Sequence, residues 1–147
     1  MLQQTGVPDR RSLVNEALAR PEEEVRIAAL STLAEVNPDE AFPILKEALA
    51  DPSAKVRAEA ASAMGKLEDE RAYEVLEKAI EDESPRVQEA ALISLTQAGG
   101  LDGVLLTAEQ LKALLAHPKP SRRRTAARTL GALRARSMTL PLLQLLK

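Results

Sequence analysis

The sequence predicts an all-α protein built as an α-solenoid, which is a stack of similar helix pairs. Three observations support this prediction. The 147-residue chain is rich in Ala, Leu, Glu, Lys and Arg, the strongest helix formers, and only 1% of its residues are aromatic. Apolar residues recur at helical spacing, and the sequence repeats itself at an offset of 31 residues.

The repeat is clearest where "RPEEEVRIAALSTLAEV", from residue 20, lies over "DPSAKVRAEAASAMGKL", from residue 51. Arg26 then meets Arg57, and Phe42 meets Tyr73, so both aromatic residues occupy one equivalent position. A third copy begins with "DESPRVQEAALISL" at residue 82. A fourth copy, "HPKPSRRRTAARTLGAL", matches the second at an offset of 66. The chain therefore contains at least four repeats of one unit.

Each unit is predicted to hold a short and a long helix. The short helices are expected at residues 9–19, 39–49, 70–80, 107–116 and 138–147, and the long ones at 22–36, 53–67, 84–98 and 120–133. In the second repeat the predicted buried positions are 72, 75, 76, 79 and 80 of the short helix and 56, 60, 63, 64 and 67 of the long one. The third repeat carries about four additional residues in "AGGLDGV", whose glycines predict a longer turn.

A helix pair of this size cannot bury its own apolar face, so neighbouring pairs must stack around one continuous core. We expect a single domain over residues 1–147, with repeats at 8–36, 37–67, 68–98 and 104–133 and a half repeat at 138–147. Because the two helices of a pair differ in length, the stack is expected to curve, with a convex and a concave surface.

The pattern D-P-x-x-x-V-R-x-x-A-A-x-A-L-G, followed by a short amphipathic helix, resembles the short HEAT-like repeats of the phycobilin-lyase type. The resemblance covers nearly the whole chain and implies an α-solenoid, with loop Asp and helix Arg residues that link adjacent repeats as scaffold. These positions are Asp51, Asp82, Arg26, Arg57 and Arg123. The third copy departs from the pattern because Gln88 replaces the Arg.

Few residues offer catalytic chemistry. The chain has no Cys and a single His, His117, which takes the inter-repeat turn position of Asp51 and is expected to be an exposed loop residue. Acidic clusters such as residues 22–24 and 81–83 fall at helix starts, where negative charge favours the positive end of the helix dipole. The segment "AGGLDG" lacks the Lys-Ser/Thr of a phosphate-binding loop. We predict a protein that is not an enzyme and that uses no cofactor or metal.

Two enzyme classes that resemble this architecture fit the sequence poorly. HEAT-like DNA glycosylases use aromatic and acidic residues around an extruded base, whereas this chain has two aromatic residues, both expected on short buried helices. Phycobilin lyases need a chromophore pocket, and no residue of the sequence marks one.

The resemblance implies that the long helices line the concave face. Ile27 and Ile93 there are either apolar anchors for a partner or, if the register is shifted by one residue, members of the core. The candidate partner-binding residues on this face are Glu23, Glu24, Ile27, Ser31, Glu35, Lys55, Ala58, Glu59, Ser62, Lys66, Arg86, Glu89, Ile93, Gln97, Ser121, Arg124, Thr125 and Arg128.

Charge is divided unevenly along the chain. Residues 1–115 hold all 22 acidic residues and 12 Lys and Arg, a net charge of −10, whereas residues 116–147 hold 8 Lys and Arg and no acidic residue. The segment "SRRRTAARTLGALRARSM" alone has six arginines, of which Arg134 and Arg136 form a basic end beyond the last long helix. Such an asymmetry concerns partners rather than fold.

Four interpretations of the basic segment remain open. It could bind an acidic segment of a protein, including the Glu-rich first repeat of a second copy in head-to-tail association. It could bind nucleic acid through phosphate contacts, although stacking aromatics are missing and the rest of the chain is acidic. It could lie on an anionic membrane surface, or it could be a solvated helix face with no partner. We favour a protein-interaction module or scaffold, with nucleic-acid binding as the alternative.

The ends of the stack carry two further expectations. Ala126, Ala127 and Leu130 are expected to hold the last long helix in place, and Arg122 replaces a core Val, so that its aliphatic stem must reach past the core. The apolar segment "SMTLPLLQLLK" has no long helix after it to cover it. Either the array continues further, or that surface binds something.

The sequence contains no Cys, no recognisable signal peptide and no apolar run long enough to cross a membrane. We therefore expect a soluble, cytoplasmic protein.

Overall fold

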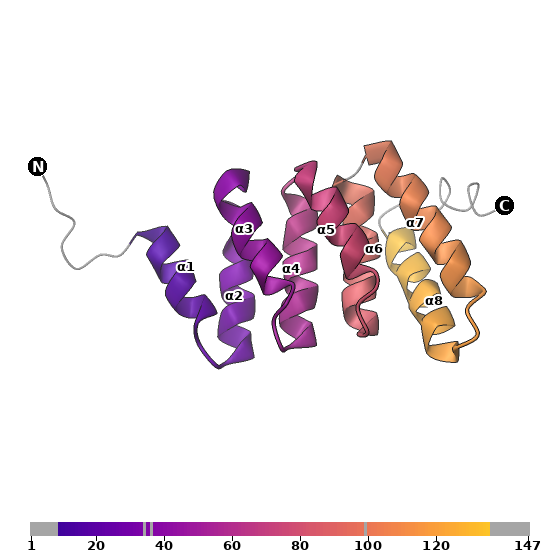
Figure 1. Ribbon diagram of the computed structural model, residues 1–147, viewed down its shortest axis with the longest axis horizontal. Helices are drawn as coiled ribbons and strands as arrows, with labels where there is room; N and C mark the ends of the chain where they lie inside the picture. Colours follow the sequence, from indigo (N-terminus) through magenta and orange to yellow (C-terminus); the bar gives the residue numbers. More distant parts are fainter. Residues whose placement is uncertain (1–8, 34, 36, 99, 136–147) are drawn as a thin grey trace, which may run out of the picture.

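The structure is a computed structural model that describes residues 9–33, 35, 37–98 and 100–135. These residues form helices joined by turns and contain no strand (Figure 1). The helices are α1 (Arg10–Leu18), α2 (Glu23–Leu33), α3 (Pro38–Ala48), α4 (Ala54–Lys66), α5 (Arg71–Ala79), α6 (Pro85–Ala98), α7 (Gly100–Leu115) and α8 (Pro120–Ala135). The prediction of an all-α solenoid is confirmed.

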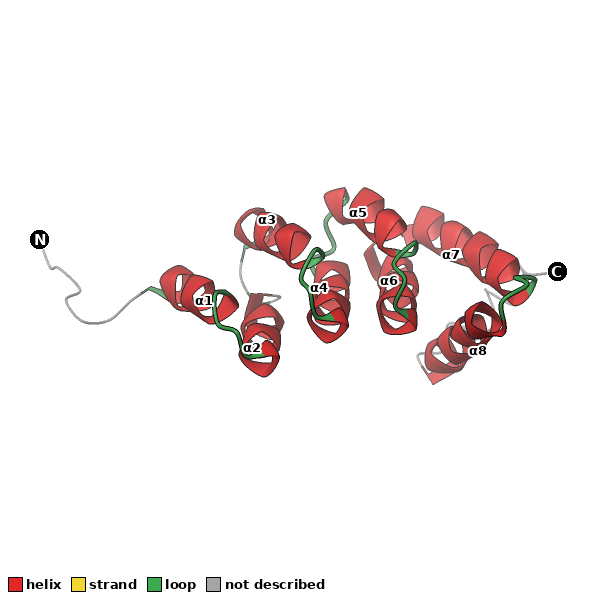
Figure 2. Ribbon diagram, turned by 60° about the horizontal axis from the view of Figure 1, so that its bottom comes forward, coloured by secondary structure: helices red, strands yellow, loops and turns green. Residues whose placement is uncertain are grey.

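The helices lie in two rows. Helices α1, α3, α5 and α7 form one row, and α2, α4, α6 and α8 form the other, with each pair antiparallel along the stack (Figures 1 and 2). Figure 2 shows the stack bent as an arch, with the even-numbered helices on its inner side. The helices predicted as long, α2, α4, α6 and α8, therefore form the concave face, as the resemblance implies, although α7 of the outer row has the same length as α8.

The core runs between the two rows. All five predicted core positions of α4 and its C-cap are buried, and Val56, Ala60 and Met64 have no exposed surface. On α5, Ala72 and Leu76 are likewise fully buried, whereas Val75 is only half-buried. Because the apolar stripe of each helix faces both its pair partner and the next repeat, the core is continuous along the stack.

Consecutive repeats are joined by an Arg–Asp clamp. Arg57 donates from Nε and Nη2 to the two carboxylate oxygens of Asp82, at 3.0 and 3.3 Å, and from Nη1 to the carbonyl oxygens of Asp51 and Pro52. Arg26 holds Asp51 in the same way, at 3.0 and 3.2 Å. The Arg57 and Asp82 side chains are only 14% and 16% exposed. Such a bidentate pair fixes the distance between one long helix and the turn before the next.

The third clamp has lost both its Arg and its Asp. Gln88 stands at the Arg position and His117 at the Asp position. The Gln88 Nε2 donates to the Ile80 carbonyl at 2.9 Å, and His117 Nδ1 accepts the Lys119 backbone N–H at 3.0 Å, as Asp51 Oδ1 accepts that of Ser53. Because Gln88 carries no charge, its burial without a carboxylate partner leaves no unpaired charge behind.

The insertion in the third repeat is helical, so the predicted long turn is wrong. Helix α7 begins at Gly100, with a φ of +54°, and not near residue 107. A Cβ on Gly103 would lie 1.9 Å from the Leu95 carbonyl oxygen, so this glycine lets α7 lie directly against α6. Gly100 thus allows the sharp turn into α7, and Gly103 allows α7 to lie close to α6. In the sequence both glycines look like residues of a loop.

Small residues set the spacing of the inner helices. A Cβ on Gly65 of α4 would lie 2.6 Å from the Ser94 Cβ of α6, and the Ser94 hydroxyl donates to the Ala61 carbonyl at 2.8 Å. Small residues on both helices therefore allow a close backbone approach at this contact.

The ends of the described stack differ from its middle. Val25 is 37% exposed although its equivalents Val56 and Val87 are buried, because no long helix lies before α2 within the described residues. Ala126 is buried and Leu130 half-buried in the stack, as expected, but Ala127 is exposed. Its equivalent, Ala61, is covered by α6, and the described residues hold no helix that covers α8 in this way.

The ninth predicted helix, 138–147, lies outside the described residues, and the repeat boundaries stay a prediction.

Replacing Asp82 with Asn should destabilise the protein, because the part-buried Arg57 guanidinium loses its carboxylate. We expect D82N to lower the free energy of unfolding by about 2 kcal/mol, measured by urea denaturation and circular dichroism. The control D39N, at a side chain that is 80% exposed, should cost less than about 0.5 kcal/mol. The double variant R57Q/D82H, which copies the third clamp, should lose less than D82N. Equal losses in D82N and D39N would contradict the clamp.

Two glycine substitutions should have opposite effects. Gly103→Ala places a methyl group against the Leu95 carbonyl and should lower the free energy of unfolding by about 2 to 3 kcal/mol. Gly131→Ala, with no described atom within 4 Å of the added Cβ, should raise it by up to about 1 kcal/mol through helix propensity. Thermal and urea denaturation of both variants test this pair, and a neutral Gly103→Ala would show that α7 does not depend on the close approach.

Candidate partner-binding groove

A groove of about 660 Å³ runs across the concave face. We call it the inner groove. It receives residues from all four inner helices and from the turn before α6. It is lined by Ile27, Lys55, Ala58, Glu59, Ser62, Ser84, Pro85, Arg86, Glu89, Ala90, Ile93 and Arg128.

The structure brings half of the predicted concave-face residues together in this groove. Residues from α2, α4, α6 and α8 meet there although they are up to about a hundred positions apart in sequence, because the repeat returns the same helical register to the same face. The predicted residues that line it are Ile27, Lys55, Ala58, Glu59, Ser62, Arg86, Glu89, Ile93 and Arg128.

Ile27 and Ile93 lie partly in the groove and partly on the core. Both side chains are half-buried and pack against the buried cluster, and both line the groove. Both residues therefore contribute to the core and keep part of their surface in the groove, and their role as anchors for a partner stays a prediction. Ile27 lies on α2 and Ile93 on α6, with α4 between them, so the groove offers apolar surface at two separate points. Such surface suits a partner's apolar side chains.

Charged side chains cross between neighbouring helices at the groove edges. Lys55 Nζ lies 3.5 Å from Glu23 Oε1, and the Ser53 hydroxyl donates to Glu23 Oε2 at 2.6 Å. The Ser53 hydroxyl, helped by Lys55, holds the pKa of Glu23 below its ordinary value. At the other edge Arg128 Nε lies 3.8 Å from Glu89 Oε2. These pairs are largely exposed and contribute little to stability, so a partner's charges can compete for them.

Other predicted positions lie outside the groove. Glu23, Glu24, Glu35, Lys66, Gln97, Ser121, Arg124 and Arg134 are not among its lining residues, and all but the half-buried Glu23 are exposed. The Ser31 hydroxyl donates to the Ile27 and Ala28 carbonyls of its own helix. Arg136 lies outside the described residues.

Two predicted outward positions are buried. Thr125 is 1% exposed and donates to the Ser121 carbonyl at 3.1 Å, because α8 turns this side toward its neighbours. Ala58 is 8% exposed, since it lies on the groove floor between α2 and α6.

Three further residues line the groove without being predicted from the sequence: Ser84, Pro85 and Ala90. In the sequence, Pro85 is recognisable only as a residue of the first turn of a helix. The structure shows that this first turn of α6 lines the groove.

Arg122 extends its aliphatic stem past the core to the turn before α6, as expected from its place at a core Val position. It is half-buried, and its Nη1 donates to the Asp82 carbonyl at 3.3 Å. Arg123 donates from Nη1 to the His117 and Pro118 carbonyls at 2.7 and 2.9 Å, as Arg57 does to the equivalent turn. Both arginines therefore bond to backbone carbonyls of the scaffold. Arg123 stays exposed, as do Arg124, Arg128 and Arg134, and these four carry the exposed positive charge of α8.

In the part of the chain that the structure describes, no three His, Asp or Glu side chains are placed to hold a metal ion. Over the same residues, no helix has the length and hydropathy needed to span a membrane.

Comparisons with known proteins agree with this architecture. The family model described as HEAT repeats matches residues 11–96, more than half of the chain. One similar solved structure is a chain from the complex of CpcE and CpcF of phycocyanin lyase from Nostoc sp. PCC7120, with a TM-score of 0.60 and 23% identity. The similarity covers 99% of this chain and 60% of that one, so the present chain spans about three fifths of its length. An engineered protein matches with a TM-score of 0.50 and 20% identity, over 92% of this chain and 68% of its own. No curated protein sequence matches.

Proposed function

Because this chain belongs to the HEAT repeat family, we propose that it is a non-catalytic module that binds a segment of a partner protein in its inner groove. HEAT repeats generally serve as protein-interaction scaffolds. The similar chain from Nostoc is part of a complex of two proteins, CpcE and CpcF, which agrees with a protein partner.

The observation that carries the proposal is the composition of the groove. Half-buried Ile27 and Ile93 lie in one groove with Lys55, Arg86 and Glu89 around them. Apolar anchors inside a charged rim are typical of protein interfaces, in which the buried centre supplies affinity and the rim supplies specificity.

The charge gradient along the concave face indicates which segment fits. The face is acidic at α2, mixed at α4 and α6, and basic at α8, where Arg124, Arg128 and Arg134 are exposed. We infer a partner segment with apolar side chains for Ile27 and Ile93 and acidic residues toward α8. Such a segment aligns its charges with the gradient, which favours one direction of binding.

Binding should be tested with a partner captured by the immobilised chain and then purified. The groove variant K55E/R86E should weaken the purified complex roughly tenfold or more, measured by calorimetry, because it reverses two rim charges. The control K78E/K112E makes the same charge change at exposed positions of the outer row and should alter affinity less than about twofold. A groove variant that binds as tightly as the original chain would contradict the proposal.

A second candidate is nucleic-acid binding, favoured by the exposed arginines of α8. Anisotropy titration with a generic oligonucleotide at two salt concentrations separates the candidates, because each phosphate contact makes affinity fall with salt. Nucleic-acid binding would be favoured if the chain binds the oligonucleotide at physiological salt, if R124E/R128E no longer binds it, and if K55E/R86E still does. Absence of binding at low salt removes it.

Head-to-tail self-association is the remaining proposal for the basic end. The acidic first turn of α2, with Glu23 and Glu24, would meet α8 of a second copy. Sedimentation at varied salt tests it, because such an assembly should dissociate as salt rises. A monomer at all ionic strengths contradicts it.

A further inference from the structure

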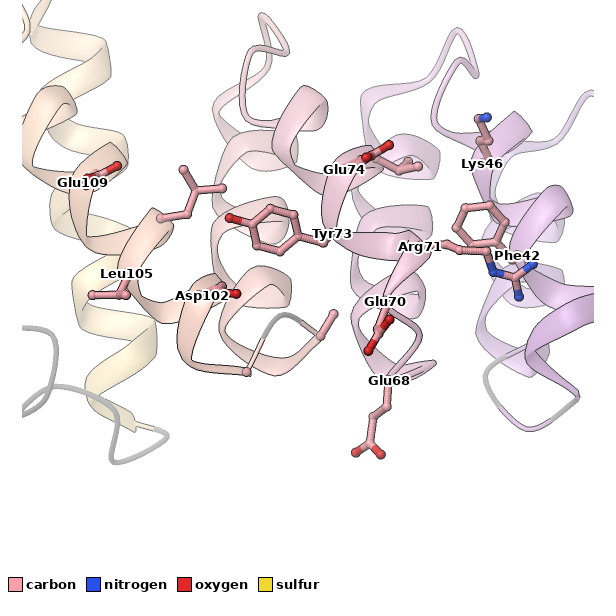
Figure 3. Close-up of a pocket in the computed structure, with 14 residues that line it drawn as sticks. Phe42, Lys46, Glu68, Glu70, Arg71, Tyr73, Glu74, Asp102, Leu105 and Glu109 are labelled. Atoms are coloured by element: carbon pink, nitrogen blue, oxygen red, sulfur yellow. The ribbon is translucent and has the colours of Figure 1, made fainter.

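A second cavity lies on the opposite side of the molecule. This outer cleft, of about 1230 Å³, runs between α3, α5 and α7 of the outer row and contains both aromatic residues of the chain (Figure 3). Its lining includes Phe42 at one end and Tyr73 with Leu105 at the other. Both aromatic side chains are half-buried, so each ring presents part of its surface to the cleft.

At the Phe42 end the protein supplies its own cation. The Arg71 guanidinium carbon lies 4.7 Å from the centroid of the Phe42 ring. Asp39 and Asp69 hold this guanidinium at 2.8 and 2.6 Å, and they raise the pKa of Arg71 above its ordinary value. The arrangement is a cation–π contact with acidic counter-charges, contributed by two successive repeats.

At the Tyr73 end the corresponding cation is missing. Tyr73 is the repeat equivalent of Phe42. Buried Ala72 and Leu76 of α5 match buried Thr107 and Leu111 of α7, so the residue that corresponds to Arg71 is Leu106. Among the residues that line the cleft, the bases are Lys46 and Arg71, and Figure 3 places both at the Phe42 end.

The acidic groups around Tyr73 are nevertheless present. Asp102 and Glu109 of α7 line the cleft on the α7 side of the Tyr73 ring, with Glu109 further from the ring than Asp102, and both are exposed (Figure 3). Burial, followed by the charges of Glu77, Asp102 and Glu109, raises the pKa of Tyr73. The ring therefore lies near carboxylates of Glu77, Asp102 and Glu109 that form no ion pair with another described residue, beside the apolar surface of Leu105, which is 40% exposed.

We propose that the Tyr73 end of the outer cleft binds an arginine or lysine side chain carried by a segment of a partner protein. The cation lies over the Tyr73 ring, Asp102 and Glu109 supply the counter-charges, and the aliphatic stem packs on Leu105 and Leu106. The contact repeats the one that Arg71 makes with Phe42 one repeat earlier. It is separate from the inner groove, so it does not depend on the function proposed above.

The chain contains its own reporter for this site. Tyr73 is the only Tyr, and there is no Trp, so tyrosine fluorescence and tyrosinate absorbance both report this position alone. A short peptide of alternating arginine and serine serves as the probe. We expect it to change the Tyr73 fluorescence saturably and to lower the pKa of Tyr73, because a bound cation favours the phenolate. Peptide binding that leaves both signals unchanged overturns the proposal, since the peptide then binds elsewhere.

Affinity is measured with a labelled form of the same peptide. D102N/E109Q should weaken binding roughly fivefold or more, the size expected for two partly exposed charge pairs. The control E16Q/E47Q removes the same charge from exposed positions outside the cleft and should change affinity less than about twofold. Equal losses in the two variants would show that net charge, not this site, attracts the peptide.

The ring itself is tested by substitution at Tyr73. Y73F should retain binding, because Phe keeps the aromatic face, whereas Y73L should lose it while circular dichroism shows a folded protein. Equal affinity of Y73F and Y73L would overturn the cation–π arrangement. If the chain instead dimerises without peptide, and D102N/E109Q prevents this, the occupant is the basic helix of a second copy and the proposal of a partner protein is wrong.

Discussion

The Arg–Asp clamp between consecutive repeats is the interaction on which the rest of the structure depends. Arg57 and Asp82 bind each other through two hydrogen bonds while Arg57 also holds two carbonyl oxygens of its own turn. The Arg26–Asp51 and Arg57–Asp82 clamps thereby fix the starts of α4 and α6 relative to the long helix before each of them. With Gly65 and Ser94 in close contact further along, the inner helices can take only one spacing. The inner groove and its alternating charges are consequences of that spacing.

The same repetition gives the molecule two different faces. On the concave side, outward positions of four helices converge in one groove, with apolar and charged side chains in reach of a single partner segment. On the convex side, aromatic residues of successive repeats lie in one cleft, where a cation from the next repeat covers Phe42 but not Tyr73. The residue before the buried position of each short helix varies along the stack, being Arg71 on α5 and Leu106 on α7, and this variation creates a difference between two otherwise equivalent aromatic positions.

Repetition is also what made the fold and much of the groove predictable from the sequence. The 31-residue period and the buried positions 56, 60, 63, 64 and 67 follow from helical spacing alone, and the register of one repeat transfers to the others. The failures occur where the period breaks or ends. The sequence predicts a turn at Gly103 because a close contact between helices leaves no periodic signal. It predicts that Ala127 packs in the stack, yet this residue is exposed because the described stack has no further long helix to cover it. The outer cleft was not predicted, since burial of Phe42 and Tyr73 depends on how the short helices splay.

We propose that the inner groove of this HEAT repeat protein is its partner-binding surface. Hydrogen–deuterium exchange of the chain alone and with its purified partner tests this most directly, because it reports each helix separately in the intact complex. We expect added protection in α4 and α6, whose residues form most of the groove. Protection confined to α8 or to the outer helices α3, α5 and α7 would contradict it.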